Sequence, residues 1–310
     1  VQDRTGVKTT RDNVLITPGG QSALYAAHMV TCDAGDTALY LDPFYATYPG
    51  TIRGVSCTPR RIATRAEDAF QPRRNDIAAQ AAGAKSLLIN SPNNPTGVVY
   101  TRDTVEMLAD VAKRHDLWLI SDEVYDSQIW EGAHLSPRQL PDMAERTLVI
   151  GSMSKSHAMT GSRVGWVCGP EAVIENLINL STHTTYGVPG YIQDAALFAL
   201  NEGAPLEEDV GAPFRRRRDI ALRLLSVQNM VQHVPSGGAM YMMLDIRATG
   251  LSGLEFANAL LDEEKIAVMP GESFGSAAAG HVRVALTVAD DAFESAFQTV
   301  LNFASALVAN

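Results

Sequence analysis

The 310-residue sequence is poor in cysteine, has no long apolar run and has no surplus of positive charge. Its three cysteines (Cys32, Cys57 and Cys168) are odd in number and widely spaced, which favours reduced buried thiols in a cytoplasmic protein over a disulfide or metal site. No stretch approaches the ~20 apolar residues that cross a bilayer, so no membrane partner is expected. The formal net charge of -10 favours a soluble protein and argues against a nucleic-acid surface.

The beginning of the sequence lacks a signal peptide and a starting methionine. It opens Val1-Gln2-Asp3-Arg4 instead of with a basic and then apolar segment, and a strand is expected almost at once. Because of the missing methionine and the early strand, we expect that residues preceding Val1 in the protein are missing from this chain. Internal repeats and low-complexity tracts are absent too. With 46% hydrophobic residues, the chain is long enough for a large core and two domains.

Short β-rich runs alternate with helical stretches from Asn13 to about Cys168. The expected strands are Val14–Thr17, Ala38–Leu41, Ser86–Asn90, Leu117–Ser121 and Thr147–Gly151, and the expected helices are Gln21–Val30 and Thr101–His115, the latter capped by Thr101. This alternation predicts βαβ units and a largely parallel sheet covered on both faces. Ligands bind beyond the carboxyl ends of the strands in such sheets.

The second part of the chain predicts a smaller α+β domain. After a helical stretch over Glu171–Leu200, the segment Asn201–Pro213 is rich in Glu, Gly and Pro and is the best boundary, so we expect a large domain over residues 1–204 and a small one over 205–310. Helices are expected at Phe214–Val227, Gly253–Glu264 and Asp291–Val308, with strands near Met240–Ile246 and Val282–Thr287. Arg215–Arg218 is expected to form a solvated face with ion pairs to Glu207, Glu208 or Asp209.

A lysine stands among small hydroxyl residues in the run Gly151–Arg163. The amine of Lys155 can form a Schiff base with an aldehyde, and Arg163, eight positions on, can hold a phosphate in bidentate fashion. An aldehyde and a phosphate are the two handles of pyridoxal phosphate (PLP). Ser152 is expected to help bind the phosphate, and Ser154 and His157 to play supporting roles. Most lysines near serines are solvated loop residues, so this interpretation depends on further motifs.

Two strand-end motifs could bind the two ends of such a cofactor. The Gly19-Gly20-Gln21 turn lies between a strand and a helix, where backbone N–H groups can approach a phosphate. Tyr45, in Asp42-Pro43-Phe44-Tyr45, could stack on a flat heteroaromatic ring. Each has an ordinary alternative, since many βα turns carry two glycines, and Tyr45 and Tyr48 could be core aromatics.

Two more motifs carry polar side chains at strand ends. In Asn90–Gly97, two prolines fix a rigid loop that projects the Asn94 amide toward a phenolate oxygen such as PLP O3′. Asp122 could keep the pyridine nitrogen protonated, and Tyr125, three residues on, could donate to O3′. The alternatives are a turn that binds nothing and a helix cap. Glu123 points away from Asp122 if the strand persists, so we expect it to be structural.

An arginine interrupts the apolar strand His281–Leu286. A buried arginine without an anionic partner is costly, so Arg283 is expected to meet either the α-carboxylate of an amino-acid substrate or an internal acid. The glycine-rich loops Pro235–Gly238 and Pro270–Gly275 are expected to border the same site.

These motifs together resemble the class I/II PLP-dependent aminotransferases of fold type I. Five of them follow the family's order and spacing across essentially the whole chain: Gly19–Leu24, Pro92–Gly97, Ser121–Tyr125, Ser152–Arg163 and His281–Leu286. The resemblance implies a mainly parallel large domain, an α+β small C-terminal domain and a cytoplasmic homodimer. It also implies a ping-pong transfer of an amino group from an amino acid to a 2-oxo acid, with Lys155 moving the proton.

The resemblance also assigns roles to individual residues. It implies that Lys155, Asp122 and Tyr125 are catalytic, and that Asn94 and Arg283 bind substrate. The implied cofactor-binding set is Gly19, Gly20, Gln21, Tyr45, Asn94, Asp122, Tyr125, Ser152, Ser154, Lys155 and Arg163. No metal is implied.

Finer similarity points to substrates. Four stretches resemble bacterial arginine–pyruvate aminotransferases, so L-arginine and pyruvate are the expected donor and acceptor: Asp116–Tyr125, Ser154–Gly161, Met243–Ser252 and Glu272–His281. The stretch Ser181–Leu200 contains no arginine, which disfavours a dedicated dicarboxylate enzyme.

The chain also departs from the family pattern. Ser162 stands where relatives often carry Trp, and Gln21 where many carry Lys or Thr. The family's N-terminal arm, with a tyrosine that reaches the partner subunit's phosphate, is missing. Three other functions remain open: an aspartate, aromatic or broad-range aminotransferase, a PLP-dependent C–S β-lyase, and the ligand-sensing domain of a transcription regulator, for which the chain shows no winged-helix module.

Overall fold

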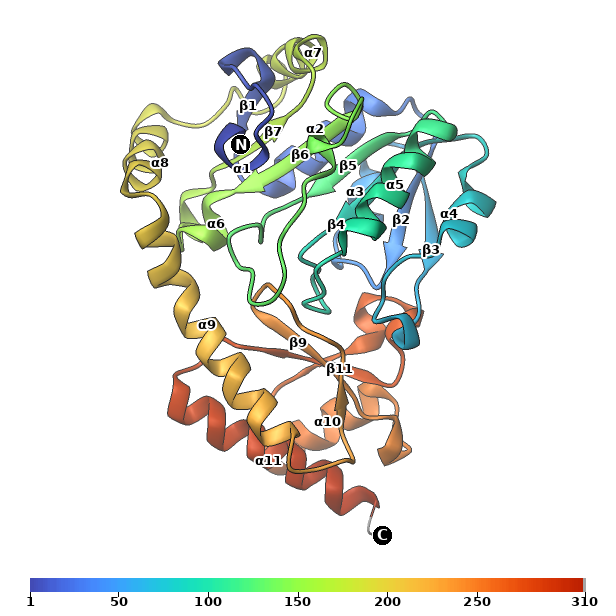
Figure 1. Cartoon of the computed structure of the whole chain (residues 1–310), viewed down its shortest axis with the longest axis vertical. Coiled ribbons are helices and arrows are strands. Elements are labelled where there is room, and N and C mark those ends of the chain that lie inside the picture. Colours follow the sequence, from blue (N-terminus) through green and yellow to red (C-terminus); the bar gives the residue numbers. More distant parts are fainter. Residues whose placement is uncertain (309–310) are drawn as a thin grey trace.

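Residues 1–308, which the computed structural model of the chain describes, form a seven-stranded sheet and a four-stranded sheet (Figure 1). The larger sheet has the order β1-β7-β6-β5-β4-β2-β3, and β7 runs antiparallel to both of its neighbours while the remaining pairs are parallel. Its strands are β1 (Val14–Thr17), β2 (Thr37–Asp42), β3 (Thr58–Ala63), β4 (Ala84–Asn90), β5 (Trp118–Asp122), β6 (Thr147–Ser152) and β7 (Gly165–Cys168). The predicted α/β fold with a largely parallel sheet is confirmed.

Helices cover the larger sheet on both faces because its central strands are apolar on both sides. In β4, Leu87 and Ile89 pack into one core cluster and Leu88 into the other, as the two-residue period of a strand requires. The first cluster lies under α4 (Arg74–Ala81) and α5 (Arg102–Arg114), and the second under α2 (Gly20–Thr31), α3 (Tyr48–Gly54) and α7 (Glu171–Thr182). The predicted cap of α5 is confirmed, since the Thr101 hydroxyl accepts the Thr104 N–H at 3.2 Å.

The four-stranded sheet is antiparallel, with the order β10-β11-β9-β8, and lies beyond the carboxyl edge of the larger one (Figure 1). Its strands are β8 (Gln232–His233), β9 (Tyr241–Asp245), β10 (Met269–Pro270) and β11 (His281–Ala285). A separate core cluster joins this sheet to α9 (Ala204–Leu225), α10 (Gly253–Glu264) and α11 (Asp290–Val308). The expected α10 has the same bounds in the structure, and it begins with a capping box between Ser252 and Glu255.

The helix α9 begins ten residues earlier than the sequence predicts. The expected start at Phe214 is wrong, because Pro205 lies in the first turn, where a missing N–H costs nothing, and Pro213 is accommodated within the helix. The expected domain boundary between residues 204 and 205 therefore falls in the first turn of a helix that reaches both sheets (Figure 1). The division into a large domain over residues 1–204 and a small domain over residues 205–310 stays a prediction.

The arginine run Arg215–Arg218 is only partly a solvated face. Arg216 and Arg217 pair with Asp290 at 2.9 and 2.8 Å, and only Arg215 pairs with one of the expected acids, Glu208, at 3.7 Å. Arg218 is buried, donates to the Ser236 carbonyl at 2.6 Å and pairs with Glu131. The expectation of an entirely solvated run is wrong, because one side of α9 packs against the smaller sheet.

The helix α8 (Gly190–Glu202) and the loop before it expose several large apolar side chains. Tyr186 is 90% exposed, Tyr191 75% and Phe198 69%. In the part of the chain that the structure describes, no helix is both long and apolar enough to cross a membrane.

Candidate active site

A cavity of about 200 Å³ opens at the carboxyl ends of β4, β5 and β6, beside the N-terminus of α2. Its lining contains most of the expected site residues: Gly20, Gln21, Tyr45, Asn94, Asp122, Tyr125, Ser152, Ser154, Lys155 and Arg163. The structure thus brings together residues from five separate stretches of sequence. Gly19 and Arg283 are the expected residues outside this lining. Gly19 lies against Arg163, and Arg283 contacts the lining residues Asn94 and Tyr241.

Asp122 is a buried carboxylate at the end of β5. Its Oδ2 accepts the Tyr48 hydroxyl at 2.7 Å and its Oδ1 accepts the Val124 N–H at 3.3 Å. Burial raises the pKa of Asp122 to about 6, although these two hydrogen bonds act in the opposite direction. Among residues 1–308 no basic side chain pairs with it, and a turn rather than a helix follows β5, which leaves the helix-cap alternative without support. A cationic ring nitrogen would compensate this carboxylate.

The opposite end of the cavity is suited to an anion. The helix α2 has no side-chain cap, so its first N–H groups point at the site together with the positive end of the helix dipole. Gly19, at φ 85°, lies so close to the Arg163 guanidinium that a Cβ at this position would overlap it. Arg163 donates to the Thr160 carbonyl at 2.9 Å, and no described acidic side chain pairs with it. These donors form a cradle for a phosphate.

Two of the expected phosphate residues have other partners for their side chains. The Ser152 hydroxyl donates to the Val164 carbonyl at 3.1 Å and accepts the Ser154 N–H at 3.1 Å. The Gln21 amide is held by Thr47 and Thr51, at 3.0 and 2.7 Å. Gln21 can therefore offer the cavity its backbone N–H from the first turn of α2.

Lys155 stands on α6 (Met153–Ser156), the short helix that follows β6. The helix is fixed by its Ser152 cap, and the Lys155 carbonyl accepts the Gln128 side-chain amide at 3.1 Å. The Lys155 amine itself has no hydrogen bond or ion pair within the described residues, and it is half-buried in the cavity lining. A held backbone and an unengaged amine make Lys155 available to a ligand.

Four tyrosines form much of the cavity wall. Tyr45 and Tyr48 meet edge to face with ring centroids 5.7 Å apart, and Tyr125 and Tyr241 do so at 6.0 Å. The Tyr125 hydroxyl donates to that of Tyr241 at 3.4 Å. Sequence reasoning left Tyr48 as a possible core residue and missed Tyr241. The available signals were the spacing of Tyr48 three residues after Tyr45 and the position of Tyr241 just after the Pro235–Gly238 loop.

Arg283 lies on β11 between two aromatic rings. Its guanidinium carbon is 4.3 Å from the Tyr241 ring centroid and 4.5 Å from that of Phe274, and Nη1 donates to Asn94 Oδ1 at 2.8 Å. Its Nε is buried without a partner, and burial lowers the pKa of the guanidinium. The expected alternative, an internal acid, is not found among the described residues. Arg283 can therefore accept a carboxylate from a ligand.

Glu123, expected to be structural, and His157, expected to play a supporting role, both lie outside the lining of this cavity. Glu123 accepts the Ser136 hydroxyl at 2.7 Å and lies 3.1 Å from His134 Nε2. His157 Nδ1 lies 2.7 Å from the Ser156 hydroxyl, and its Nε2 lies 3.8 Å from Glu207 of α9. Asp122 and Glu123 thus line different pockets, and so do Lys155 and His157.

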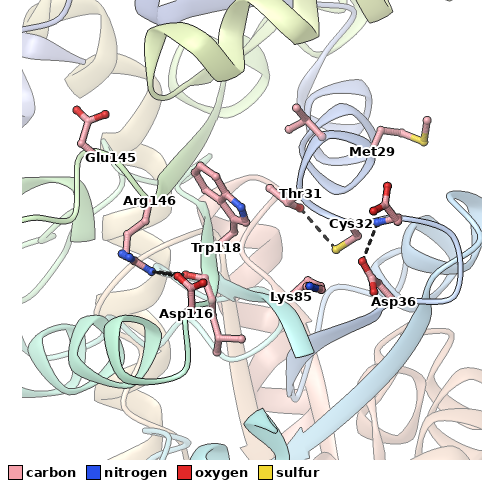
Figure 2. A pocket seen from close by; sticks show the side chains of 12 residues that line it. Met29, Thr31, Cys32, Asp36, Lys85, Asp116, Trp118, Glu145 and Arg146 are labelled. Atoms are coloured by element: carbon pink, nitrogen blue, oxygen red, sulfur yellow. Dashed lines mark hydrogen bonds and ion pairs between the residues drawn. The ribbon is translucent and has the colours of Figure 1, made fainter. Parts of the chain in front are cut away.

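A second hollow, of about 430 Å³, lies at the opposite, amino edge of the larger sheet (Figure 2). Figure 2 shows Lys85 and Trp118 within it, and Arg146 paired with Asp116 at 3.3 Å. Although it is larger, it lies on the side of a parallel sheet where ligands do not usually bind. Its lining includes Lys85, but it combines that lysine with neither a buried carboxylate nor an anion cradle of the kind found around Lys155.

The carboxyl-edge cavity fits PLP on three observations of this structure. It holds a desolvated carboxylate without a cation at Asp122, a cradle for an anion at Gly19 and Arg163, and an unengaged amine at Lys155 in the same lining. These match the ring nitrogen, the phosphate and the aldehyde of the cofactor, respectively.

Comparison with known proteins shows the family of this chain. Residues 1–300 match the family described as aminotransferase class I and II. The chain is 39% identical over 306 residues to the arginine–pyruvate transaminase AruH of Pseudomonas aeruginosa, covering 98% of this chain and 78% of that protein. It is 36% identical to a probable aspartate/prephenate aminotransferase of Thermus aquaticus, covering 97% and 78%.

Solved structures show the same fold. The aspartate aminotransferase from Thermus thermophilus with maleate superposes with a TM-score of 0.91 at 32% identity, over 97% of this chain and 78% of that one. An aromatic aminotransferase from Pyrococcus horikoshii superposes with a TM-score of 0.94 at 29% identity, over 98% and 82%.

Proposed function

Because this chain belongs to the class I and II aminotransferases, a family of PLP-dependent enzymes of fold type I, we propose that it transfers the amino group of L-arginine to pyruvate. The observation that carries the substrate choice is the 39% identity, over 98% of this chain, to a relative named for that reaction. The stretch Ser181–Leu200 offers no arginine that could bind the second carboxylate of a dicarboxylate donor.

We assign binding roles from the contacts of the cavity. Arg163 and the first turn of α2 would hold the cofactor phosphate through charge-assisted hydrogen bonds. Asp122 would hold a proton on the ring nitrogen, because an ionised pair in that buried position is better compensated than a lone carboxylate. Asn94 and Tyr125 would donate to the ring oxygen O3′, and Tyr45 would stack on the ring.

The reaction itself falls to Lys155 and Arg283. Bound PLP supplies an electron sink for the electron pair left on the substrate Cα when its proton leaves. Arg283 would bind the substrate α-carboxylate and so orient the Cα–H bond toward the Lys155 amine. The Lys155 amine would act as the general base that takes the proton from the substrate Cα, and its ammonium form would act as the general acid.

A second candidate is an aminotransferase for aspartate, prephenate or aromatic substrates. It is favoured by the 36% identity to the probable aspartate/prephenate aminotransferase of Thermus aquaticus. A C–S β-lyase would use the same side chains, and only the leaving group on the substrate would distinguish it. Release of ammonia and pyruvate from a sulfur amino acid without any acceptor would identify the lyase.

We also propose a homodimer in the cytoplasm. The exposed apolar side chains on α8 and before it, Tyr186, Tyr191 and Phe198, form a surface that a second copy of the chain would cover. All three cysteines are free, which fits a reducing compartment. Analytical ultracentrifugation would test the dimer, and a purely monomeric protein at micromolar concentration would contradict it.

The deciding experiment is a half-reaction screen on the PLP-loaded protein. Amino acids are added one at a time without acceptor, and the loss of the visible band of lysine-bound cofactor is recorded. We expect L-arginine to remove the band and pyruvate to restore it. If arginine leaves the band unchanged while aspartate or an aromatic amino acid removes it, the second candidate is correct.

A further inference from the structure

The loop that carries Phe274 is bonded to the end of β2, although the two segments are more than two hundred residues apart in sequence. The Phe44 N–H donates to the Phe274 carbonyl at 2.9 Å. Three residues further, the Ala277 N–H lies 3.3 Å from each oxygen of the Asp42 carboxylate, and the Ser276 hydroxyl lies 3.5 Å from Oδ2. Asp42 thus joins the larger sheet to the loop that connects β10 and β11 of the smaller sheet.

Asp42 is fully buried, and a buried carboxylate is costly unless its oxygens are satisfied. Its only basic partner among the described residues is Arg61, at 3.4 Å, and that arginine is half-exposed. The loop supplies the remaining donors. The fit is close, because Gly275 adopts φ 120° and a Cβ at this position would overlap the Asp42 carboxylate.

The same loop supplies one of the three contacts that fix the Arg283 guanidinium. The Phe274 ring lies 4.5 Å from the guanidinium carbon, the Tyr241 ring lies 4.3 Å from it, and Asn94 accepts from Nη1 at 2.8 Å. Tyr241 begins β9, Asn94 lies in the loop after β4, and both line the cavity. Phe274 lies on a loop of short 3-10 turns, Gly271–Phe274 and Ser276–Ala278, which depends on its anchors.

We propose that Asp42 is a positioning residue for substrate binding: by anchoring the Ser276–Ala277 backbone, it holds Phe274 against Arg283 and so orients the guanidinium toward the substrate α-carboxylate. This inference rests on the proposed function, in which Arg283 receives that carboxylate. Asp42 itself touches neither the cavity nor Arg283. Its removal should therefore weaken carboxylate binding and leave the cofactor and the Lys155 chemistry unaffected.

The test compares the PLP-loaded wild type with Asp42→Ala, Asp42→Asn and the control Arg61→Gln, which removes the exposed partner of Asp42 and keeps the loop contacts. Propionate, a carboxylate with no amino or keto group, is titrated calorimetrically into each. We expect Asp42→Ala to weaken propionate binding about tenfold, the size of one lost hydrogen bond to a charged group. Asp42→Asn, which keeps one acceptor oxygen for Ala277, should show a smaller loss, and Arg61→Gln should bind as the wild type does.

Further measurements separate a positioning role from a structural one. Hydrogen exchange should become faster at the Ala277 amide in Asp42→Ala, while the visible cofactor band stays at its wild-type position. The KM values for amino acid and oxo acid should rise about tenfold with kcat nearly unchanged, because the interaction lost is one of binding. In an Arg283→Lys background, Asp42→Ala should have little additional effect on propionate affinity.

Unchanged propionate affinity in Asp42→Ala, with or without a lower melting temperature, would overturn the inference. So would an equal loss in the Arg283→Lys background, since Asp42 would then act by another route. If the wild type binds propionate but transaminates no amino acid, the proposed function fails on its own, and the affinity series still decides the role of Asp42.

Discussion

The hydroxyl of Tyr48 donates a 2.7 Å hydrogen bond to the carboxylate of Asp122 at the buried end of β5. This bond favours the ionised carboxylate and so opposes the effect of burial on its pKa. Tyr48 thereby prepares Asp122 to meet a positive charge on a ligand, although Tyr48 itself would not touch the reacting atoms.

The first prediction concerns this pair. Replacing Tyr48 with Phe removes the donor and keeps the ring, so the pKa of Asp122 should rise further and binding of a protonated ring should weaken. We expect about a tenfold loss of PLP affinity, measured by equilibrium dialysis. The matched control is Tyr40→Phe, a buried tyrosine of the same core cluster that has no contact with Asp122. Equal affinities for Tyr48→Phe and Tyr40→Phe would show that the hydrogen bond has no role in cofactor binding.

The second prediction concerns the stability of the cofactor-free protein. Burial raises the pKa of Asp122 from its ordinary 3.8 to about 6, so the folded state binds more protons than the unfolded state between these values. Below this pH window the carboxyl is protonated in both the folded and the unfolded state, so its ionisation does not lower the free energy of unfolding. Through the window, stability falls as the pH rises, by up to about 3 kcal/mol at neutral pH.

Asp122→Asn removes this titration, so its stability relative to the wild type should increase from pH 4 to pH 7 by a similar amount. Urea unfolding of both proteins across this range measures the difference. Stability curves that stay parallel across the range would mean that Asp122 does not titrate in it.

The third prediction concerns the two lysines at opposite edges of the sheet. Lys155→Ala should abolish the visible band and the borohydride-trapped covalent adduct with PLP, and should lower turnover by at least about a thousandfold. Lys85→Ala, at the amino-edge hollow in Figure 2, should change neither property. Mass spectrometry after reduction locates the adduct. An adduct on Lys85, or one that survives in Lys155→Ala, would refute the assignment.

The fourth prediction concerns the anion cradle. Arg163→Gln should weaken PLP binding about 10- to 100-fold, because a charge-assisted contact to phosphate is lost. It should leave the weaker binding of pyridoxal, which has no phosphate, nearly unchanged. Fluorescence titrations with the two compounds provide the comparison. An equal loss for both would mean that Arg163 supports the fold of the cavity rather than the phosphate.

The sequence predicted which polar residues would line one cavity, where their motifs follow strands. Lys155, Asp122, Arg163 and Asn94 could be located because strand ends of a parallel sheet converge, so a polar group after each strand faces a common cavity. The family resemblance then fixed the fold and the reaction class.

The sequence could not show which aromatic side chains converge on the site. Tyr48, Tyr241 and Phe274 have the composition of ordinary core residues, and their role follows only from neighbours far away in sequence. It also misplaced the start of α9, since the proline and glycine of Asn201–Pro213 predict a boundary by local propensity while tertiary packing allows a helix. The partners of Arg218, Ser236 and Glu131, could not be predicted either, because they also depend on tertiary packing.

The continuous helix α9 constrains how the sequence between its two ends can change. Near its start, Glu207 pairs with Arg4 and approaches His157, two residues from Lys155. Ten positions later, Arg217 bonds to Asp290 and to the Leu286 carbonyl of the smaller sheet's layer. A helix turns by about 100° per residue, so inserting or deleting a single residue between Glu207 and Arg217 would rotate one group of contacts away from its partners. The number of residues between Glu207 and Arg217 is therefore fixed by the contacts at both ends of the helix. We expect insertions and deletions only outside α9.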